Sequence, residues 1–321
     1  MPTLPVPPND ELKLADWLEI LALISDDQRA SLGDLERALR RSSVLETGDD
    51  QRTQEAIGEK SVQVVSELRA RARSAKEAYP FALDGSTVRV IGTTDRWAPY
   101  LFCLCLSAIG ASQPRSQQLF PRRLFEHLSR VAAAAYLGGD SVRFASPRTG
   151  LPRPFAKAVT VLCNRLGEGE RFRDQPSLSR KDATLDVVAW KYFPDLLPGK
   201  IILFGQCASG ADWTTKLAAL RPKDFCDQWM LEPPPSSLLR ACFIPHRVPA
   251  ERWNWFTRQG GILFDRCRLA YWSDTGAGAA LLRQILHWTR LTLRQAKQLN
   301  SRAVQPRRKT ATRRNPRAGA G

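Results

Sequence analysis

Two stretches with strand-like alternation lie in the middle of a chain whose other apolar residues mostly follow helical spacing. Residues 184–190 read Thr-Leu-Asp-Val-Val-Ala-Trp, and residues 200–207 read Lys-Ile-Ile-Leu-Phe-Gly-Gln-Cys. Proline and glycine in the segment 191–199 supply turn chemistry, which predicts a hairpin with a long loop. Residues 239–245, bounded by prolines, predict a further strand, and 261–271 is compatible with a strand or a helix. The chain is therefore expected to be α/β.

Helical periodicity dominates on both sides of these strands. Residues 1–82 are expected to be mainly helical, with Asp10-Glu11 as a start signal, and 86–91 is a short alternating segment. Glycines should end two later helices in left-handed geometry. The later helices are predicted at 124–137 (ended by Gly138), 154–166 (ended by Gly167), 212–220 (with Asp212 as N-cap) and 278–298.

Composition divides the chain into three parts. The 321 residues are 43% apolar and 25% charged, which is typical of a globular protein. A break rich in Gln, Pro and Arg at 112–118 predicts a boundary between a helical region, 1–115, and an α/β domain, 116–299. The formal charge is +16, and residues 290–321 hold ten Lys/Arg and no acid. We expect 300–321 to be a disordered basic tail that binds polyanions.

Cysteine usage and the apolar runs predict a cytoplasmic protein without a membrane segment. The seven cysteines form no CxxC pair, and their odd number and scatter do not suggest a disulfide framework. The longest apolar run, 97–111, is shorter than the roughly 18–20 residues that cross a bilayer. We expect it to be a buried helix.

Polar residues interrupt both of the central strands on a face that should be apolar. Because alternate residues of a strand share a face, Asp186 lies in line with Val188 and Trp190. Gln206 likewise continues the row of Ile202 and Phe204. An acid in such a row is costly unless something compensates it, and a bound divalent cation is one such partner.

In this arrangement the chain resembles the PD-(D/E)XK, or restriction-endonuclease-like, nuclease superfamily over roughly residues 120–250. The resemblance lies in Glu126 within Leu-Phe-Glu-His-Leu, Asp186 within Leu-Asp-Val-Val-Ala-Trp-Lys and Gln206 within Phe-Gly-Gln-Cys-Ala-Ser-Gly. It implies a mixed-sheet core in which Glu126, Asp186 and Gln206 surround Mg²⁺ or Mn²⁺, with the Cys207 carbonyl available to the metal. The order of helix, two strands, helix and strand is the expected one.

One position departs from the family pattern. The superfamily has a lysine two residues after the last acid, and this chain has Ala208 there, a Gln-x-Ala variant of the third motif. Lys216, one turn into the next helix, is the preferred substitute for that catalytic lysine. Lys191 lies at odd spacing from Asp186 and should point to the opposite face.

The resemblance implies a metal-dependent nuclease that hydrolyses DNA, with roles in prokaryotic defence or DNA processing. Hydrolysis develops negative charge on oxygen, which a hard cation stabilises while it acidifies water. The alternative is a catalytically inactive nuclease fold that binds nucleic acid and recruits a protein partner through the N-terminal helices. A helical scaffold for another protein is a third possibility. Basic residues expected to contact phosphates are Arg143, Arg148, Arg153, Arg171, Arg173, Arg180 and Lys181.

Each candidate residue also has a purely structural interpretation. Asp186 could pair with Lys181 or Arg180, and Gln206 could hydrogen-bond a neighbouring loop. Glu126 could be a surface residue paired with Arg122 or Arg130, and Lys216 a solvated lysine. Cys207 has no histidine at a spacing that suggests a base, so a thiol nucleophile is not expected. Five tryptophans could stack bases, although packing is the simpler interpretation: Trp190, Trp213, Trp229, Trp253 and Trp255.

Overall fold

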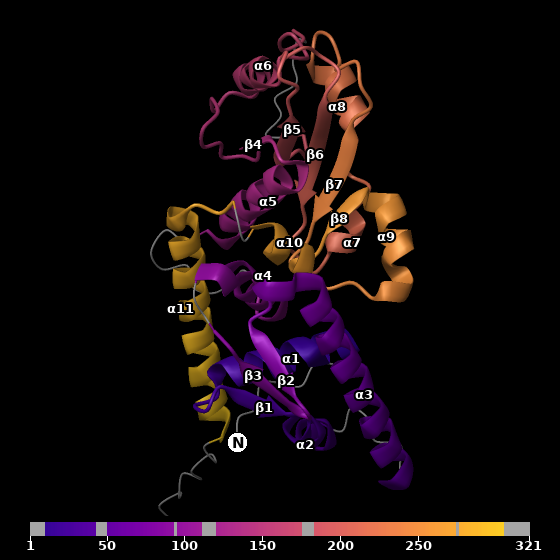
Figure 1. Cartoon of the computed structure of the whole chain (residues 1–321), viewed down its shortest axis with the longest axis vertical. Helices are drawn as coiled ribbons and strands as arrows, with labels where there is room; N and C mark the ends of the chain where they lie inside the picture. Colours follow the sequence, from indigo (N-terminus) through magenta and orange to yellow (C-terminus); the bar gives the residue numbers. More distant parts are fainter. Residues whose placement is uncertain are drawn as a thin grey trace, which may run out of the picture.

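A mainly helical half and a half built on a mixed sheet make up the computed structural model of the chain, one above the other in Figure 1. The fold is mixed α/β, as the sequence predicts. The structure describes residues 10–42, 50–92, 95–110, 120–174, 183–273 and 276–304, with side chains as far as residue 300.

The helical half is formed by the first third of the chain. Its elements are α1 (Glu11–Ile24), β1 (Arg29–Ser31), α2 (Leu32–Ser42), α3 (Asp50–Ala75), the 3₁₀ turn η1 (Lys76–Ala78), β2 (Phe81–Asp84), β3 (Thr87–Val90), the 3₁₀ turn η2 (Asp95–Trp97) and α4 (Ala98–Ala108).

The α/β half follows. Its elements are α5 (Pro121–Leu137), β4 (Asp140–Arg143), α6 (Phe155–Leu166), β5 (Val187–Lys191), β6 (Ile201–Cys207), α7 (Trp213–Lys216), α8 (Pro222–Trp229), β7 (Leu239–Phe243), the 3₁₀ turn η3 (Ala250–Arg252), α9 (Trp253–Gly260), β8 (Ile262–Phe264), α10 (Arg266–Ser273) and α11 (Ala279–Val304).

Local signals explain several helix ends. The Asp10 side chain caps α1 by accepting hydrogen bonds from the Leu12 and Lys13 amides, at 3.0 and 3.1 Å. Gly138 ends α5 and Gly167 ends α6, both with left-handed backbone at φ of 63° and 64°. The predicted helix boundaries at these sites are confirmed.

A small antiparallel sheet with strand order β1-β3-β2 lies within the helical half. Strand β3 coincides with the alternating segment predicted at 86–91, whereas β1 and β2 lie in or at the end of the region predicted to be mainly helical. Strands of three and four residues are too short to produce a period-2 pattern, so this part of the prediction was wrong.

The larger sheet has five strands in the order β4-β5-β6-β7-β8. The first three are antiparallel, and β6, β7 and β8 are parallel. The hairpin of β5 and β6 and the strand β7 confirm the predictions, and the ambiguous segment 261–271 divides into β8 and the start of α10. Strand β4 was not predicted.

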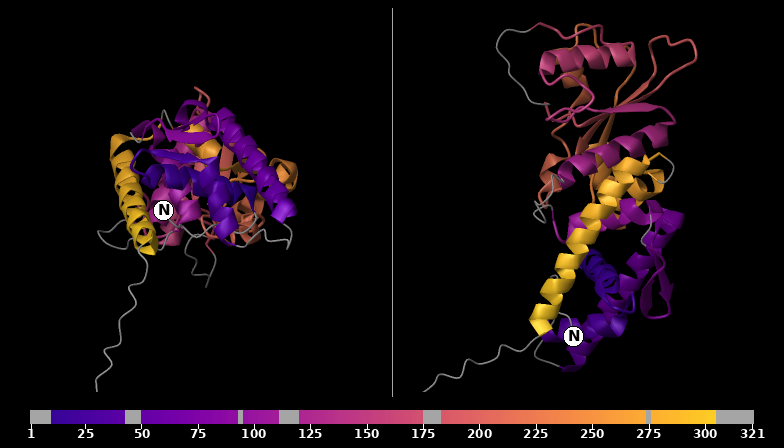
Figure 2. Two further views of the ribbon diagram at one scale, coloured as in Figure 1. Left: turned by 90° about the horizontal axis from the view of Figure 1, so that it is seen from below. Right: turned by 90° about the vertical axis from the view of Figure 1, so that its left-hand side faces the viewer.

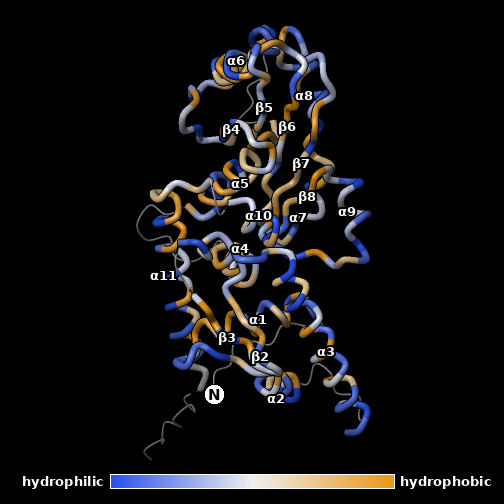
Figure 3. Tube along the Cα trace, in the orientation of Figure 1, coloured by the Kyte–Doolittle hydropathy of each residue, from blue (hydrophilic) through white to orange (hydrophobic). Residues whose placement is uncertain are grey.

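The two faces of this sheet pack against different helices. Val188, Trp190, Ile202 and Phe204 join a core with α6 and α8. Val187 and other residues of alternate register join a second core with α5 and the helical half. The strands are therefore buried on both faces, which explains the hydrophobic residues along β6 and β8 in Figure 3.

Helix α4 lies at the centre of the molecule, and its residues from Ala98 to Leu106 are all buried. The apolar run 97–111 is thus a core helix, as predicted. None of the helices in the described ranges is long and apolar enough to cross a membrane.

The end of the chain returns to the helical half. Helix α11 packs on α4, α5 and α1, and Figure 2 shows it running from the level of α5 down along the side of the helical half. It continues to Val304, past the predicted start of the tail at 300. The predicted boundary at 115–116 and most of the basic tail, 305–321, lie outside the described residues.

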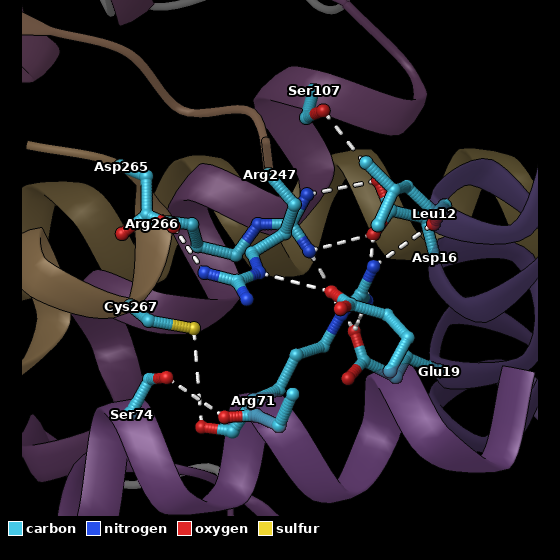
Figure 4. Close-up of polar contacts among 12 residues, drawn as sticks. Leu12, Asp16, Glu19, Arg71, Ser74, Ser107, Arg247, Asp265, Arg266 and Cys267 are labelled. Carbon is cyan, nitrogen blue, oxygen red and sulfur yellow. Dashed lines mark hydrogen bonds and ion pairs between the residues drawn. The ribbon is translucent and has the colours of Figure 1, made fainter. Parts of the chain in front are cut away.

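A buried group of charged side chains joins the two halves, and Figure 4 shows most of it. We call it the junction cluster, and its members are Asp16, Glu19, Glu67, Arg71, Arg247, Asp265 and Arg266. Arg266 of α10 donates two hydrogen bonds, of 2.7 and 2.8 Å, to the carboxylate of Asp16 in α1. Arg71 of α3 also bonds Asp16, at 2.7 Å, and Glu19, at 2.8 Å.

Each carboxylate of the junction cluster accepts a hydrogen bond from an arginine side chain. Burial alone would raise the pKa of Asp16, but Arg266 and Arg71 outweigh it and lower that pKa to about 2. Glu19 accepts hydrogen bonds from the hydroxyls of Tyr79 and Tyr100 at 2.7 and 2.9 Å. These contacts connect residues up to 250 positions apart and fix α1, α3 and α10 together.

Candidate active site

Asp186 lies just before β5, and Gln206 lies near the end of β6. The antiparallel register ends with Val187 opposite Gly205, so Asp186 and Gln206 each lie one residue beyond the last pair. The Asp186 amide donates to the Gly205 carbonyl at 3.0 Å, whereas a continued pairing would join Asp186 to Gln206. The structure therefore brings the backbones of these two predicted site residues close together, outside the regular pairing.

The Asp186 side chain is held by the neighbouring strand. Its Oδ2 accepts a hydrogen bond of 2.7 Å from the amide of Cys207. Its own carbonyl accepts one of 2.7 Å from the Phe144 amide. The partners expected for a merely structural Asp186, Arg180 and Lys181, lie outside the described residues.

Gln206 is the most deeply buried of the predicted site residues, with only 7% of its surface exposed. Within the described part of the chain, its Oε1 has no hydrogen-bond partner. A buried acceptor without a donor costs about 1–3 kcal/mol of stability. The alternative in which Gln206 bonds a neighbouring loop through this oxygen is not what the structure shows, and the atom is available to a cation or a donor.

Glu126, from α5, is anchored by an arginine that the sequence did not suggest as its partner. Arg143 of β4 reaches the Glu126 Oε2 with its Nε at 2.7 Å and its Nη2 at 2.5 Å. Arg143 is 2% exposed and also donates to the Pro147 carbonyl at 2.8 Å. A largely buried ion pair with Arg143 is thus a contact of Glu126 that the sequence did not suggest.

The carboxylates of Asp186 and Glu126 both lie near the Cys207 thiol. Burial, together with the nearby Asp186 and Glu126 carboxylates, raises the pKa of the Cys207 thiol well above its ordinary value. Both acids therefore lie close to this residue, and the thiol stays protonated, which agrees with the absence of a predicted nucleophilic role. The part assigned to the Cys207 carbonyl as a metal ligand stays a prediction.

Lys216 ends the one-turn helix α7, which is shorter than the predicted helix 212–220. Its Nζ lies 3.2 Å from the carboxylate of Asp212, and its side chain is 42% exposed. Asp212 stands at the N-cap position, but its side chain makes no capping hydrogen bond there. The catalytic role of Lys216 stays a prediction.

Lys191 lies at the other end of β5, five residues from Asp186, or about 16 Å along the strand. A side-chain atom added at Gly138 would lie 3.4 Å from the Lys191 Nζ, which places this lysine beside the end of α5. Lys191 therefore lies far from Asp186 along the strand, and the predicted difference in face stays a prediction.

Several of the basic residues expected to contact phosphates have structural roles instead. Arg143 is buried in the ion pair with Glu126, and the guanidinium of Arg148, itself buried, lies over the rings of Phe144 and Phe155. Arg173 donates to two backbone carbonyls around residue 230. The expectation was wrong for Arg143 and Arg148, because each fills a position inside the fold; Arg153 and Arg171 are exposed.

A group next to Glu126 was missed in the sequence. Arg123, His127 and Arg130 follow one another at four- and three-residue spacing and so share one side of α5. Burial, followed by the charges of Arg143, Arg130 and Arg123, lowers the pKa of His127 to about 4. The i, i+7 spacing of Arg123 and Arg130 beside an acid was a signal that could have indicated two cations on this side of α5.

Neither a clustered set of metal ligands in the described ranges nor a similar known protein accompanies the candidate site. Within the described residues, no group of three or more His, Cys, Asp or Glu side chains is arranged to hold a metal ion. The chain matches no protein-family model, no curated protein and no solved structure.

Proposed function

We propose that the chain is a metal-dependent nuclease that hydrolyses phosphodiester bonds of DNA at the strand ends where Asp186 and Gln206 meet. The observation that carries the proposal is the buried oxygen of Gln206, which has no partner among the described residues and follows Gly205, whose carbonyl accepts from the Asp186 amide. A protein interior tolerates such an atom mainly where a ligand or a function compensates it. The order of α5, β5, β6, α7 and β7 also agrees with the order implied by the resemblance.

The donor set suits a hard cation. Mg²⁺ and Mn²⁺ prefer carboxylate and amide oxygens, so Asp186 and the Oε1 of Gln206 would hold the ion, with substrate oxygens and water completing its shell. When bound, the cation would stabilise negative charge on phosphate oxygens and lower the pKa of a water molecule.

The remaining residues of the site act through position and charge. The Cys207 amide fixes the Asp186 carboxylate at 2.7 Å, so the ligand oxygen is oriented by a rigid strand. Arg143 holds Glu126 beside the site and brings a permanent cation to a region where the family lysine is missing. Arg123 and Arg130 would neutralise backbone phosphates next to the reacting group, while His127 between them is neutral at physiological pH.

The rival function is a nuclease fold that binds nucleic acid without cutting it. Two observations favour it: Glu126 is engaged by Arg143, and Lys216 pairs with Asp212 on the surface. Under this alternative the same face binds DNA, and the N-terminal helices position a protein partner. A role in prokaryotic defence or DNA processing belongs to the proposal in either form, as does a cytoplasmic location.

An assay of DNA cleavage by the full-length chain distinguishes the active nuclease from the inactive DNA-binding module. Wild type is incubated with plasmid and linear DNA in Mg²⁺, Mn²⁺ or chelator, beside Asp186→Asn and the matched surface variant Asp224→Asn. The proposal expects metal-dependent cleavage that disappears in Asp186→Asn, survives in Asp224→Asn and leaves DNA binding in place, because only a ligand charge has been removed. Binding without cleavage under every condition would instead support the inactive module.

A further inference from the structure

A cleft of about 520 Å³ lies between the two halves, on the side where α7 and α9 approach α1. The helical half contributes one side of α1 and the last residues of α4, Ser107 to Ile109. The α/β half contributes residues of α7, the loop after β7 and the start of α9. The volume falls within the range of roughly 300–1,000 Å³ that holds small organic ligands.

Aromatic rings form one wall of this cleft. Trp213 stacks on the ring of His246, with centroids 6.1 Å apart and planes 23° from parallel, and lies 4.9 Å from the ring of Phe256. Trp213 is only partly buried, and Trp17 of α1 also lines the cleft. A flat ring entering the cleft would therefore meet an aromatic surface, which is the usual way in which proteins bind nucleobases.

His246 has a fixed role in this wall. Its Nε2 lies 3.2 Å from the Gly210 carbonyl, which can only accept, so this nitrogen carries the proton. Its Nδ1 then accepts the hydrogen bond of 2.8 Å from the hydroxyl of Ser107. Burial lowers the pKa of His246 to about 4, so the ring is neutral at physiological pH and supplies a stacking surface rather than a charge.

Positively charged side chains line the edge of the cleft. The guanidinium of Arg252 lies 5.0 Å from the Phe256 ring centre and is solvent-exposed. In the described part of the chain, the side chain of Arg252 makes no hydrogen bond or ion pair. Lys13 is exposed, with Asp10 at 3.7 Å. Arg247 lines the same cleft, although Glu67 and Asp265 already engage it.

We propose that this cleft binds a nucleotide unit, meaning a planar base joined to a phosphate. The base would lie against Trp213 and donate hydrogen bonds to the last carbonyls of α4, which lack partners within the helix. The phosphate would lie between Lys13 and Arg252, whose donors are uncommitted or weakly held. The same chemistry is offered by a free nucleotide and by one residue of a single strand. This site is separate from the proposed metal site and does not depend on it.

Calorimetric titration of the full-length chain tests the proposal. The ligands are the four nucleoside monophosphates, the matching nucleosides, inorganic phosphate and an eight-residue single-stranded DNA of mixed sequence. The variants are Arg252→Gln and Lys13→Gln, with Arg258→Gln in the adjoining helix α9 as control, since Arg258 is exposed and does not line the cleft. Asp186→Asn is included to separate this site from the metal site.

The proposal expects saturable binding that weakens about tenfold in Arg252→Gln and in Lys13→Gln, because each removes a charge-assisted contact. Arg258→Gln and Asp186→Asn should bind as wild type does. A free nucleotide is the ligand if a monophosphate binds in this way and its nucleoside binds about tenfold more weakly. A strand is the ligand if only the oligonucleotide shows the Arg252 and Lys13 dependence.

Three results would overturn the proposal. They are the lack of saturable binding by any monophosphate and by the oligonucleotide, binding that is equal in wild type, Arg252→Gln and Lys13→Gln, and nucleosides that bind as tightly as their monophosphates. Trp213→Leu adds a second criterion: base binding should weaken about tenfold while the unfolding transition shows that the variant is folded.

Discussion

The junction cluster and the candidate active site both place polar groups inside the molecule, but they differ in how those groups are satisfied. At the junction, Asp16 and Glu19 are each met by arginines at 2.7–2.8 Å. At the candidate site, the carboxylate of Asp186 takes a backbone amide and the oxygen of Gln206 has no partner among the described residues. The carboxylates of the junction cluster are compensated within the protein, whereas the acceptor of Gln206 has no donor among the described residues.

This difference teaches how to separate a structural polar group from a functional one. Buried charge alone does not indicate chemistry, because the most heavily charged interior in this protein serves to join two halves of the chain. The unsatisfied atom is the more informative sign, since it lowers stability without any compensation inside the fold. Substitutions at compensated polar groups should therefore lower the free energy of unfolding, and removal of the uncompensated one should raise it.

Breaking the junction cluster should give the largest effect. Arg266→Met removes the two hydrogen bonds to Asp16 and leaves a buried carboxylate with less compensation. We expect a loss of about 3–5 kcal/mol in the free energy of unfolding, measured by denaturant titration. Lys223→Met, which breaks an exposed pair with Asp227, should cost less than about 0.5 kcal/mol. Equal losses in the two variants would show that the cluster contributes no more than a surface pair.

The histidine between the halves should give the junction a pH dependence. Burial lowers the pKa of His246 from 6.5 to about 4, so between these values the unfolded chain holds a proton that the folded chain does not. Stability should therefore fall by about 2 kcal/mol from this residue as the pH drops from 7 to 5. His246→Gln should reduce the fall by that amount, whereas the exposed control His287→Gln should retain it. An unchanged pH dependence in His246→Gln would contradict the assignment.

The candidate site should behave in the opposite sense to the junction. Gln206→Met removes the unpartnered oxygen while keeping the volume, so we expect the protein to gain about 1 kcal/mol in the free energy of unfolding. The exposed control Gln259→Met should change stability by less than about 0.5 kcal/mol. A loss of stability in Gln206→Met would show that this side chain is a satisfied part of the core.

Lys216 should give the smallest change in stability, because its pair with Asp212 is exposed. Lys216→Met is expected to alter the free energy of unfolding by less than about 0.5 kcal/mol. If this lysine has replaced the family lysine, the same variant abolishes metal-dependent cleavage and Lys191→Met does not. Cleavage lost in Lys191→Met alone would place the reacting groups at the other end of β5, and cleavage retained in both would exclude both lysines.

The sequence predicted the parts of the fold that have a long or regular signal. The hairpin of β5 and β6, the buried helix α4 and the glycine ends of α5 and α6 all followed from periodicity or backbone geometry. The strands β1 and β4 did not, since three or four residues carry too little pattern. The return of α11 to the helical half depends on long-range packing, which spacing along the chain does not encode.

The candidate site was predicted in the same uneven way. Alternation placed Asp186 and Gln206 each in an otherwise apolar row of its strand, and in the structure both lie one residue beyond the last pair of the two strands. The partner of Glu126 could not be predicted, because Arg143 comes from a strand that was not recognised. The junction cluster was missed for a related reason: Asp16 and Arg266 are 250 residues apart, and nothing local marks them as a pair.

Binding of Mn²⁺ is the most direct test of the claim that the unsatisfied atom marks a metal site. The free ion is titrated into the full-length chain and followed by its electron paramagnetic resonance signal, for wild type, Asp186→Asn, Gln206→Met and the surface control Asp224→Asn. We expect one site per chain in wild type and in Asp224→Asn, and at least tenfold weaker binding in the other two, since Asp186→Asn removes the ligand charge and Gln206→Met removes an oxygen ligand. Equal Mn²⁺ binding by wild type, Asp186→Asn and Gln206→Met would contradict the account.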